Sequence, residues 1–341
     1  MKLLNDYIKE SIGSKTPLKE GLADWDEGDF EKSIKKETSK TVIKKQIIDW
    51  IVNSTRSRIH KNKLKFDFST TPITVDYEGN IEFKYEIDSL TNGIFQWGKI
   101  NGKFNCLFTK ITSLEGSPRE VSSFDCTYCE FLKSLECAPN KCKHFTCSNC
   151  LNITSLEGGP EECDFFTCRM CGSLESLEGA PKKVREFNCE NCPNLKSLKG
   201  GPENVMDYYC PRCKNLKDLK YAPKTIKGNF ICDYCPNIKS LEGLPEQVDY
   251  LFCVGCENLE TLNGAPKKIK GDFSCIGCKK LASFKGGPEE IYGNFMFNAC
   301  PSLESLEGFP NRVGQDVYCY QTKFNKDDIK RICDVKRDIY C

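Results

Sequence analysis

Apolar residues in the second half of the chain recur in a frame of 21 or 22 residues. One turn, residues 184–198, reads VREFNCENCPNLKSL. Within it Phe187 and Cys189 alternate with polar residues, as expected of a short strand with one buried face. A fixed repeat of this length predicts a solenoid, in which each turn contacts only its neighbours.

The boundaries between turns are marked by prolines that close versions of Ser-Leu-Glu-Gly-x-Pro. These are Pro118, Pro139, Pro160, Pro181, Pro202, Pro223, Pro245, Pro266, Pro288 and Pro310. The apolar frame L-x-x-L-x-L-x-x-C-x-x-L resembles the leucine-rich repeat, in the variety with Cys at the ladder position. The resemblance covers residues 102–324 and implies a mainly β, leucine-rich-repeat-like solenoid of about eleven turns with short parallel strands.

The segments outside the repeats predict caps. In chain order the predicted parts are 1–12 (N-terminal helix), 13–40 (flexible linker), 41–100 (small α+β cap), 101–323 (solenoid) and 324–341 (helical C-terminal cap). The first cap contains a helix over 41–54 with an isoleucine stripe, then strands near 65–68, 73–77 and 81–85. In the last segment Asn325 is a candidate N-cap, and Ile329 and Ile332 are expected to face the last turn.

The 24 cysteines follow the same frame. Those in the second inward strand position are Cys106, Cys126, Cys147, Cys168, Cys189, Cys210, Cys232, Cys253, Cys275 and Cys319. Those in the ladder position are Cys129, Cys150, Cys171, Cys192, Cys213, Cys235, Cys256, Cys278 and Cys300. Cys142 and Cys163 replace an aliphatic residue, Cys137 takes a glycine slot, and Cys333 and Cys341 lie outside the array.

Three interpretations of these cysteines compete. Reduced thiols can fill the narrow interior, where free cysteine packs as a small hydrophobe and ladder thiols bond to loop backbone. Zinc needs four converging ligands, which two stacked turns could supply, but a repeated column isolates no set of four. Disulfides between stacked strands are compatible with the strand spacing but redundant in a reducing cell. We expect structural thiols, with neither metal nor other cofactor, and keep a zinc-binding protein as an alternative function.

Composition narrows the function classes. The net charge is +1, whereas a nucleic-acid-binding protein carries a basic face and a high pI. No apolar run is long enough for a transmembrane helix, and the start lacks the apolar core of a signal peptide. The two histidines, His60 and His144, are far apart, and no phosphate-binding loop follows a strand. The sequence therefore predicts a protein that is not an enzyme, acts in the cytoplasm and takes neither membrane, nucleic acid nor small molecule as its main partner.

The whole arrangement resembles a family of uncharacterised proteins encoded by large tailed bacteriophages. Their repeats read Ser-Leu-Glu-Gly-Ala-Pro followed by Phe-x-Cys, after a Leu-Thr-Asn-Gly segment like residues 90–93 here. They often begin with a short helix containing Tyr-Ile, like residues 1–12. The resemblance implies a viral origin and the cytoplasm of the host, or alternatively the virion, and it implies no catalytic activity.

The outward face of the later strands carries large apolar residues. The candidate partner-binding residues are Tyr209, Ile231, Tyr250, Phe252, Val254, Ile276, Met296 and Tyr318. An exposed strip of this kind suits a protein-binding surface, although strands also favour such residues for their own sake. Arg169 and Arg212 are the nearby cations, too few for a single-stranded nucleic acid. We therefore expect a module that binds a host or viral protein, with a virion decoration protein anchored through its N-terminal segment as the alternative.

Overall fold

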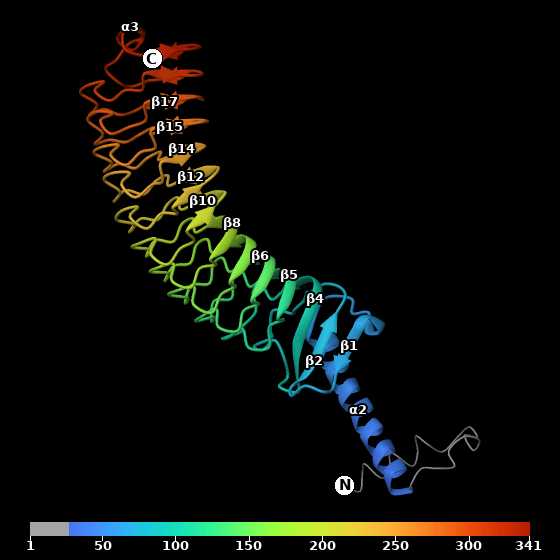
Figure 1. The fold of residues 1–341 in the computed structure, drawn as a ribbon. Coiled ribbons are helices and arrows are strands. Elements are labelled where there is room, and N and C mark those ends of the chain that lie inside the picture. Colours follow the sequence, from blue (N-terminus) through green and yellow to red (C-terminus); the bar gives the residue numbers. More distant parts are fainter. Residues whose placement is uncertain (1–26) are drawn as a thin grey trace. The chain divides into compact units, whose positions relative to one another are not determined.

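The computed structural model describes residues 27–341, with side chains from residue 36 onward. The chain divides into two units, one ending at Gln46 and one running from Ile47 to Cys341. The predicted fold class is confirmed for the described residues, which are mainly β and form a parallel β-solenoid of about 13 turns. Its strands stack one turn above the next (Figure 1).

The main sheet contains one strand from nearly every turn. Its strands are β1 (Leu64–Asp67), β2 (Ile73–Tyr77), β3 (Ile81–Glu82), β4 (Phe95–Asn105), β5 (Glu120–Asp125), β6 (Lys141–Thr146), β7 (Glu162–Thr167), β8 (Lys183–Asn188), β10 (Asp207–Tyr209), β12 (Asn229–Ile231), β14 (Tyr250–Phe252), β16 (Phe273–Ser274), β18 (Phe295–Met296), β20 (Val317–Tyr318) and β22 (Ile339–Tyr340). Two small sheets lie outside it. The first has two strands, β9 (Asn204–Val205) and β11 (Thr225–Ile226). The second has five strands: β13 (Gln247–Val248), β15 (Lys268–Ile269), β17 (Glu290–Ile291), β19 (Arg312–Val313) and β21 (Asp334–Val335).

Helix α2 spans Glu27–Ser54 and corrects one predicted boundary. The predicted linker over 13–40 is wrong for residues 27–40, which are helical; the helix over 1–12 and the rest of the linker lie outside the described residues. A polar, charged sequence such as this segment also suits a linker. Glu and Lys are strong helix formers, however, and Glu37 pairs with Lys40 across one turn at 2.8 Å.

The first cap packs the end of α2 against the first strands. Ile47 and Ile51 are fully buried, as the predicted stripe requires, and the Trp50 ring packs edge-on against Phe95 at 5.5 Å. Strand β1 pairs with β2 antiparallel, but β2 and β3 both pair in parallel with β4 rather than with each other. The parallel stacking therefore begins at β2, earlier than the repeat motif indicates. A short 3-10 helix, η1 (Lys61–Lys63), precedes β1.

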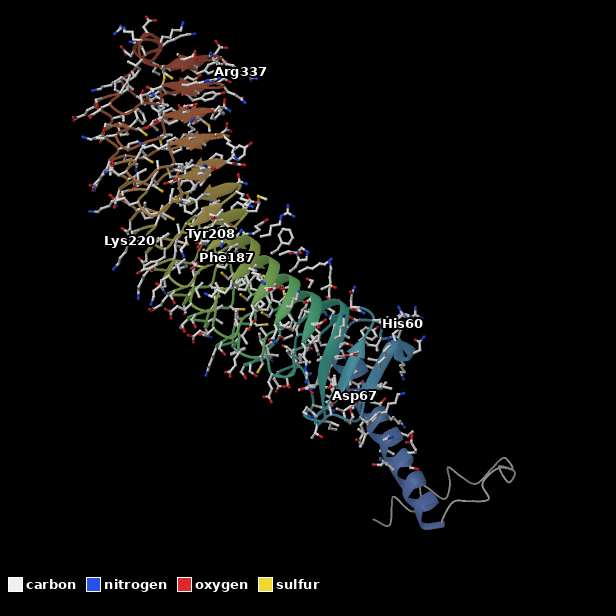
Figure 2. All side chains as sticks on the ribbon, in the orientation of Figure 1. His60, Asp67, Phe187, Tyr208, Lys220 and Arg337 are labelled. Atoms are coloured by element: carbon white, nitrogen blue, oxygen red, sulfur yellow. A yellow bond between two sulfur atoms is a disulfide. The ribbon has the colours of Figure 1, made fainter. Side chains whose placement is uncertain are left out.

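Most turns of the solenoid contribute one buried aromatic ring to a stack in its core. Phe166, Phe187 and Tyr208 are fully buried, and their ring centroids are 5.4 Å apart at each step. Figure 2 labels Phe187 and Tyr208 on their successive turns. Strands pair in register, so identical positions of successive turns lie side by side. Leu251 takes the place of the ring in β14 and pairs with Phe230 and Phe273.

In the 22-residue turns, two or three residues separate the strand of the small sheet from the strand of the main sheet. In the turn of β11 and β12, Lys227 and Gly228 separate the strands. A Cβ added at Gly228 would lie 2.5 Å from Asp207 Oδ1, and one added at Gly314 would lie 2.2 Å from the Tyr292 carbonyl oxygen. Glycine is needed here because the backbone passes so close to the turn before it.

The C-terminal segment is less helical than predicted. Helix α3 covers only Lys326–Lys330, and Asn325 caps it with the capping box that the sequence indicates. Ile329 is fully buried, but the expectation for Ile332 is wrong, because that side chain is 45% exposed. Strands β21 and β22 follow α3; β21 continues the five-stranded sheet and β22 continues the main sheet. The segment therefore adds a further turn to the array.

Candidate functional site

The structure places the predicted cysteine columns in the interior. The strand and ladder cysteines from Cys126 to Cys278 are all 0% exposed. Each of the nine ladder thiols donates a hydrogen bond to the carbonyl oxygen of the strand Cys one turn earlier, at Sγ–O distances of 3.1–3.3 Å. The columns therefore satisfy the backbone carbonyls at the corner of each turn, where the ladder ends.

Burial favours the protonated form of several of these thiols, whereas a hydrogen bond with a strand thiol lowers the pKa of the ladder residues Cys129, Cys192 and Cys300. Burial is the main cause that raises the pKa of Cys106, Cys168 and Cys210 well above the usual value, and it also raises the pKa of the ladder residue Cys235. A protonated thiol is a hydrogen-bond donor and a poor nucleophile. Among the described residues, no group of three or more His, Cys, Asp or Glu side chains converges in a way that could hold a metal ion.

These environments predict a sharp division in thiol reactivity. Cys137 is exposed and occupies the glycine slot with φ 69°. We expect iodoacetamide to alkylate Cys137 in the folded protein and to modify strand and ladder cysteines at least about 100-fold more slowly, because they require local opening. Peptide mass spectrometry after timed alkylation measures these rates, with urea-unfolded protein as the reference. Equal rates at Cys137 and Cys189 would contradict the buried columns.

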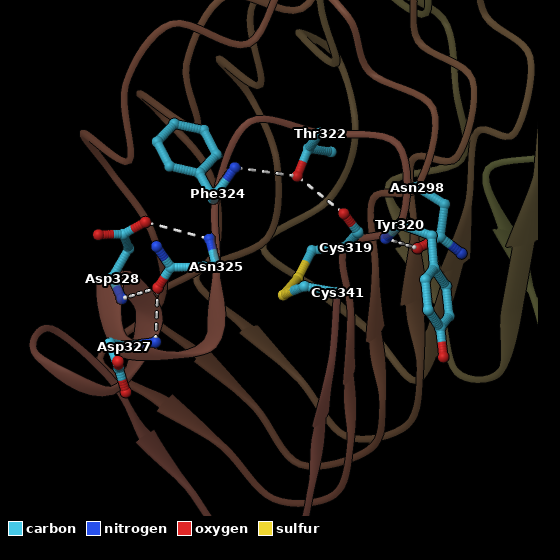
Figure 3. The surroundings of a disulfide bond; sticks show 9 residues. All are labelled: Asn298, Cys319, Tyr320, Thr322, Phe324, Asn325, Asp327, Asp328 and Cys341. Atoms are coloured by element: carbon cyan, nitrogen blue, oxygen red, sulfur yellow. Dashed lines mark hydrogen bonds between the residues drawn. A yellow bond between two sulfur atoms is a disulfide. The ribbon is translucent and has the colours of Figure 1, made fainter.

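Among the described residues, one disulfide is present, and it lies in the last turn. Cys319 and Cys341 are bonded, with their Cα atoms 4.5 Å apart (Figure 3). Strands β20 and β22 pair Tyr318 with Tyr340, so Cys341 occupies the strand-cysteine position of a further turn. The expectation that it lies outside the array is thus corrected. Cys333 is buried beside β21, and burial raises its pKa to about 12.

The predicted partner-binding residues fall into one outward row and its borders. Strand pairing places the following in register on successive strands: Tyr209, Ile231, Phe252, Ser274, Met296, Tyr318 and Tyr340. We call this row the outward strip. Its large side chains are half-buried up to Tyr318, and Tyr340, which sequence reasoning missed, is 38% exposed. Ser274 is 1% exposed between its register neighbours Phe252 and Met296.

The remaining three predicted residues border the outward strip. Val254 and Ile276 each follow a strand cysteine and are half-buried. Tyr250 is 41% exposed. A Cβ built on Gly271 would lie only 2.2 Å from the Tyr250 ring and would clash with it. Gly271 therefore gives the Tyr250 ring its place at the edge of the outward strip.

Carboxylates stand two residues before four positions of the outward strip, and Glu186 holds the equivalent place one strand earlier, in β8. We call this set the acidic row: Glu186, Asp207, Asp272, Asp316 and Asp338. Asp207 and Asp272 each accept a hydrogen bond through Oδ1 from the backbone of the next turn, from Asn229 at 2.8 Å and Asn294 at 2.7 Å. Burial, with a smaller contribution from Asp207, raises the pKa of Glu186. The row thus adds negative charge beside the apolar side chains.

A left-handed residue at every corner is a second feature that the sequence did not reveal. The residue two places after each strand cysteine, or after Phe297 where that residue replaces the cysteine, has a positive φ between 55° and 71°. These residues run from Phe108 to Gln321. The N–H at this position donates to a carbonyl of the next turn, as Phe108 does to Thr127 at 2.9 Å. Glycine fills this position only at Gly255 and Gly277, so its composition gives no sign of the conformation. Phe108 and Tyr128 are exposed there and stack at 4.5 Å.

Comparison of the chain with protein-family models, curated proteins and solved structures found no match. In the part of the chain that the structure describes, no helix has the length and apolar character needed to span a membrane. The site is therefore defined by its geometry: a cysteine-rich solenoid repeat with an apolar strip on its strand face.

Proposed function

We propose that this chain is a non-enzymatic protein–protein interaction module that binds its partner through the outward strip. We further propose that it is encoded by a tailed bacteriophage and acts on a host or viral protein in the host cytoplasm. The supporting observation is the register of the strands, which gathers Tyr209, Phe252, Met296 and Tyr318 on one face. Seven strands spaced about 4.8 Å apart give the strip a length of roughly 29 Å. Large apolar and aromatic anchors in such a row are typical of binding hot spots.

The acidic row defines the chemistry of the partner. An apolar strip with carboxylates along one edge complements a surface on which apolar side chains lie beside Lys or Arg. Exposed charge pairs of this kind mainly accelerate association, and they are screened by salt. We therefore propose a basic, partly apolar segment of another protein as the ligand of the outward strip.

The test uses a photo-crosslinking residue at Met296 in the full chain within the producing cell. We expect a discrete protein adduct there, and none from the same residue at Thr167. Thr167 is the matched control because it occupies the same strand position in an earlier turn, where the row is polar.

A substitution in the outward strip tests whether partner binding depends on its apolar side chains. Phe252→Lys is expected to weaken partner binding about 30-fold, roughly 2 kcal/mol, because it removes an anchor and places a cation against a basic partner. Thr167→Lys should leave binding unchanged. Adducts of equal yield at Met296 and Thr167, or adducts unaffected by Phe252→Lys, would refute the interaction surface.

A further inference from the structure

Two cysteines, Cys142 and Cys163, are more exposed than the cysteines of the strand and ladder columns. Cys142 in β6 and Cys163 in β7 stand in the aliphatic column between Val121 and Val184, and they are direct register partners. They are 7% and 6% exposed, whereas the strand and ladder cysteines between Cys126 and Cys278 are 0% exposed. Both residues therefore keep some contact with solvent in the folded turn.

A groove gives access to both thiols. Its volume is about 440 Å³, and its lining includes Cys142 and Cys163 together with the cations of Lys141, Lys182, Lys183 and Arg185. The carboxylates in the lining belong to Glu162 and Asp164. Glu162 already pairs with Lys183 and, at 3.5 Å, with Lys141. Four cations against two carboxylates make the groove suited to an anionic ligand.

The fold also brings the two sulfurs within bonding reach. Neighbouring strands lie about 4.8 Å apart, inside the range of roughly 4.4–6.8 Å between Cα atoms that a disulfide spans. Cys319 and Cys341, which directly follow the register partners Tyr318 and Tyr340 in neighbouring turns, are bonded with a Cα–Cα distance of 4.5 Å. A bridge between Cys142 and Cys163 would thus need no rearrangement of the sheet.

We propose that Cys142 and Cys163 form a dithiol site that exchanges with a small anionic disulfide, such as glutathione disulfide, and ends as a disulfide between two turns. The site lies on β6 and β7, outside the outward strip, and does not depend on the proposed interaction function. Cys137 is exposed but is followed at its position in the next turn by Gly158. It therefore has no such partner and can form only a mixed disulfide.

The reaction balances with glutathione disulfide as the oxidant. Cys142 loses its proton and its sulfur attacks one sulfur of the glutathione disulfide, which releases one glutathione thiolate and leaves a mixed disulfide. Cys163 then loses its proton, attacks the Cys142 sulfur and releases the second glutathione. Two protein thiols are oxidised, and one glutathione disulfide is reduced to two glutathiones.

The experiment treats the folded chain, with the Cys319–Cys341 disulfide intact and the other cysteines reduced, with glutathione disulfide and then alkylates the remaining thiols. We expect two alkylatable thiols to be lost at Cys142 and Cys163, and a peptide that links them in mass spectra. The variant Cys163→Val, which restores the residue found at Val121 and Val184, should instead retain one glutathione on Cys142. Unchanged alkylation of Cys142 and Cys163 in the wild-type chain, or bridges that form equally among the strand cysteines, would overturn the proposal.

A comparison of oxidants tests the charge of the groove. At low salt, glutathione disulfide should oxidise the pair at least about 3-fold faster than the cationic disulfide cystamine. Cystamine reacting as fast or faster would show that the anionic assignment is wrong. The wild-type measurements decide the proposal even if a variant fails to fold.

Discussion

Replacing Phe187 by alanine is expected to lower the free energy of unfolding by about 4 kcal/mol. The ring is fully buried and stacks between Phe166 and Tyr208, with centroids 5.4 Å away on each side. Its removal leaves a cavity that the two flanking rings cannot both fill. Because each turn of a solenoid is stabilised only by its neighbours, the loss should also reduce cooperativity between the two halves of the array. Urea unfolding and hydrogen exchange in β7, β8 and β10 measure both effects.

The chain itself offers the matched control for this substitution. Leu251 holds the same position in β14 and is fully buried there. Phe187→Leu should therefore destabilise by only about 1.5 kcal/mol, since it keeps most of the apolar volume. If the alanine and leucine variants are equally stable, the aromatic stack is not a main source of stability.

Gly179→Ala is expected to destabilise the protein by about 3 kcal/mol or more. Gly179 has φ 87°, and a Cβ built on it would lie 2.2 Å from the Glu157 nitrogen and 2.3 Å from its Cα. A left-handed conformation alone costs an L-residue about 1–2 kcal/mol, and contacts with backbone atoms cannot be relieved by a rotamer change. Thermal and urea unfolding give the measurement.

Gly172→Ala is the control, because the added Cβ would meet only a Leu151 methyl group at 3.7 Å. It should change stability by less than about 0.5 kcal/mol. Cys137 has a side chain in the same slot as Gly179 at φ 69°, but the turn before it is one residue shorter between Thr109 and Leu114. A Gly179→Ala variant as stable as Gly172→Ala would show that the turns shift apart more easily than their hydrogen bonds suggest.

The repeat made the centre of this fold predictable, since period-two positions such as Phe187 and Cys189 fix which side chains face inward. The ends were less predictable. The turn ending in Cys341 lacks the Ser-Leu-Glu-Gly-x-Pro motif, so only its pairing with β20 reveals it. The helix over residues 27–40 was not predictable because the same charged composition suits a linker and an exposed helix.

The outward strip was predictable from the sequence, whereas the acidic row and the groove were not. The strand register follows from the period and aligns Tyr209, Ile231 and Phe252 in one row. The acidic row and the groove beside Cys142 depend on which positions of different turns become neighbours in space. The left-handed corner accepts Phe, Asn, Arg and Gly alike, so its backbone conformation has no signature in composition.

The ladder thiols have a consequence for how such an array can change in evolution. Each bonds to a carbonyl of the turn before it, and that partner is chemically the same at all nine positions. Tandem duplication or deletion of one whole turn would therefore leave every remaining thiol with an equivalent acceptor. The length of the outward strip can then change in steps of one strand, about 4.8 Å, while the packing of the core stays the same.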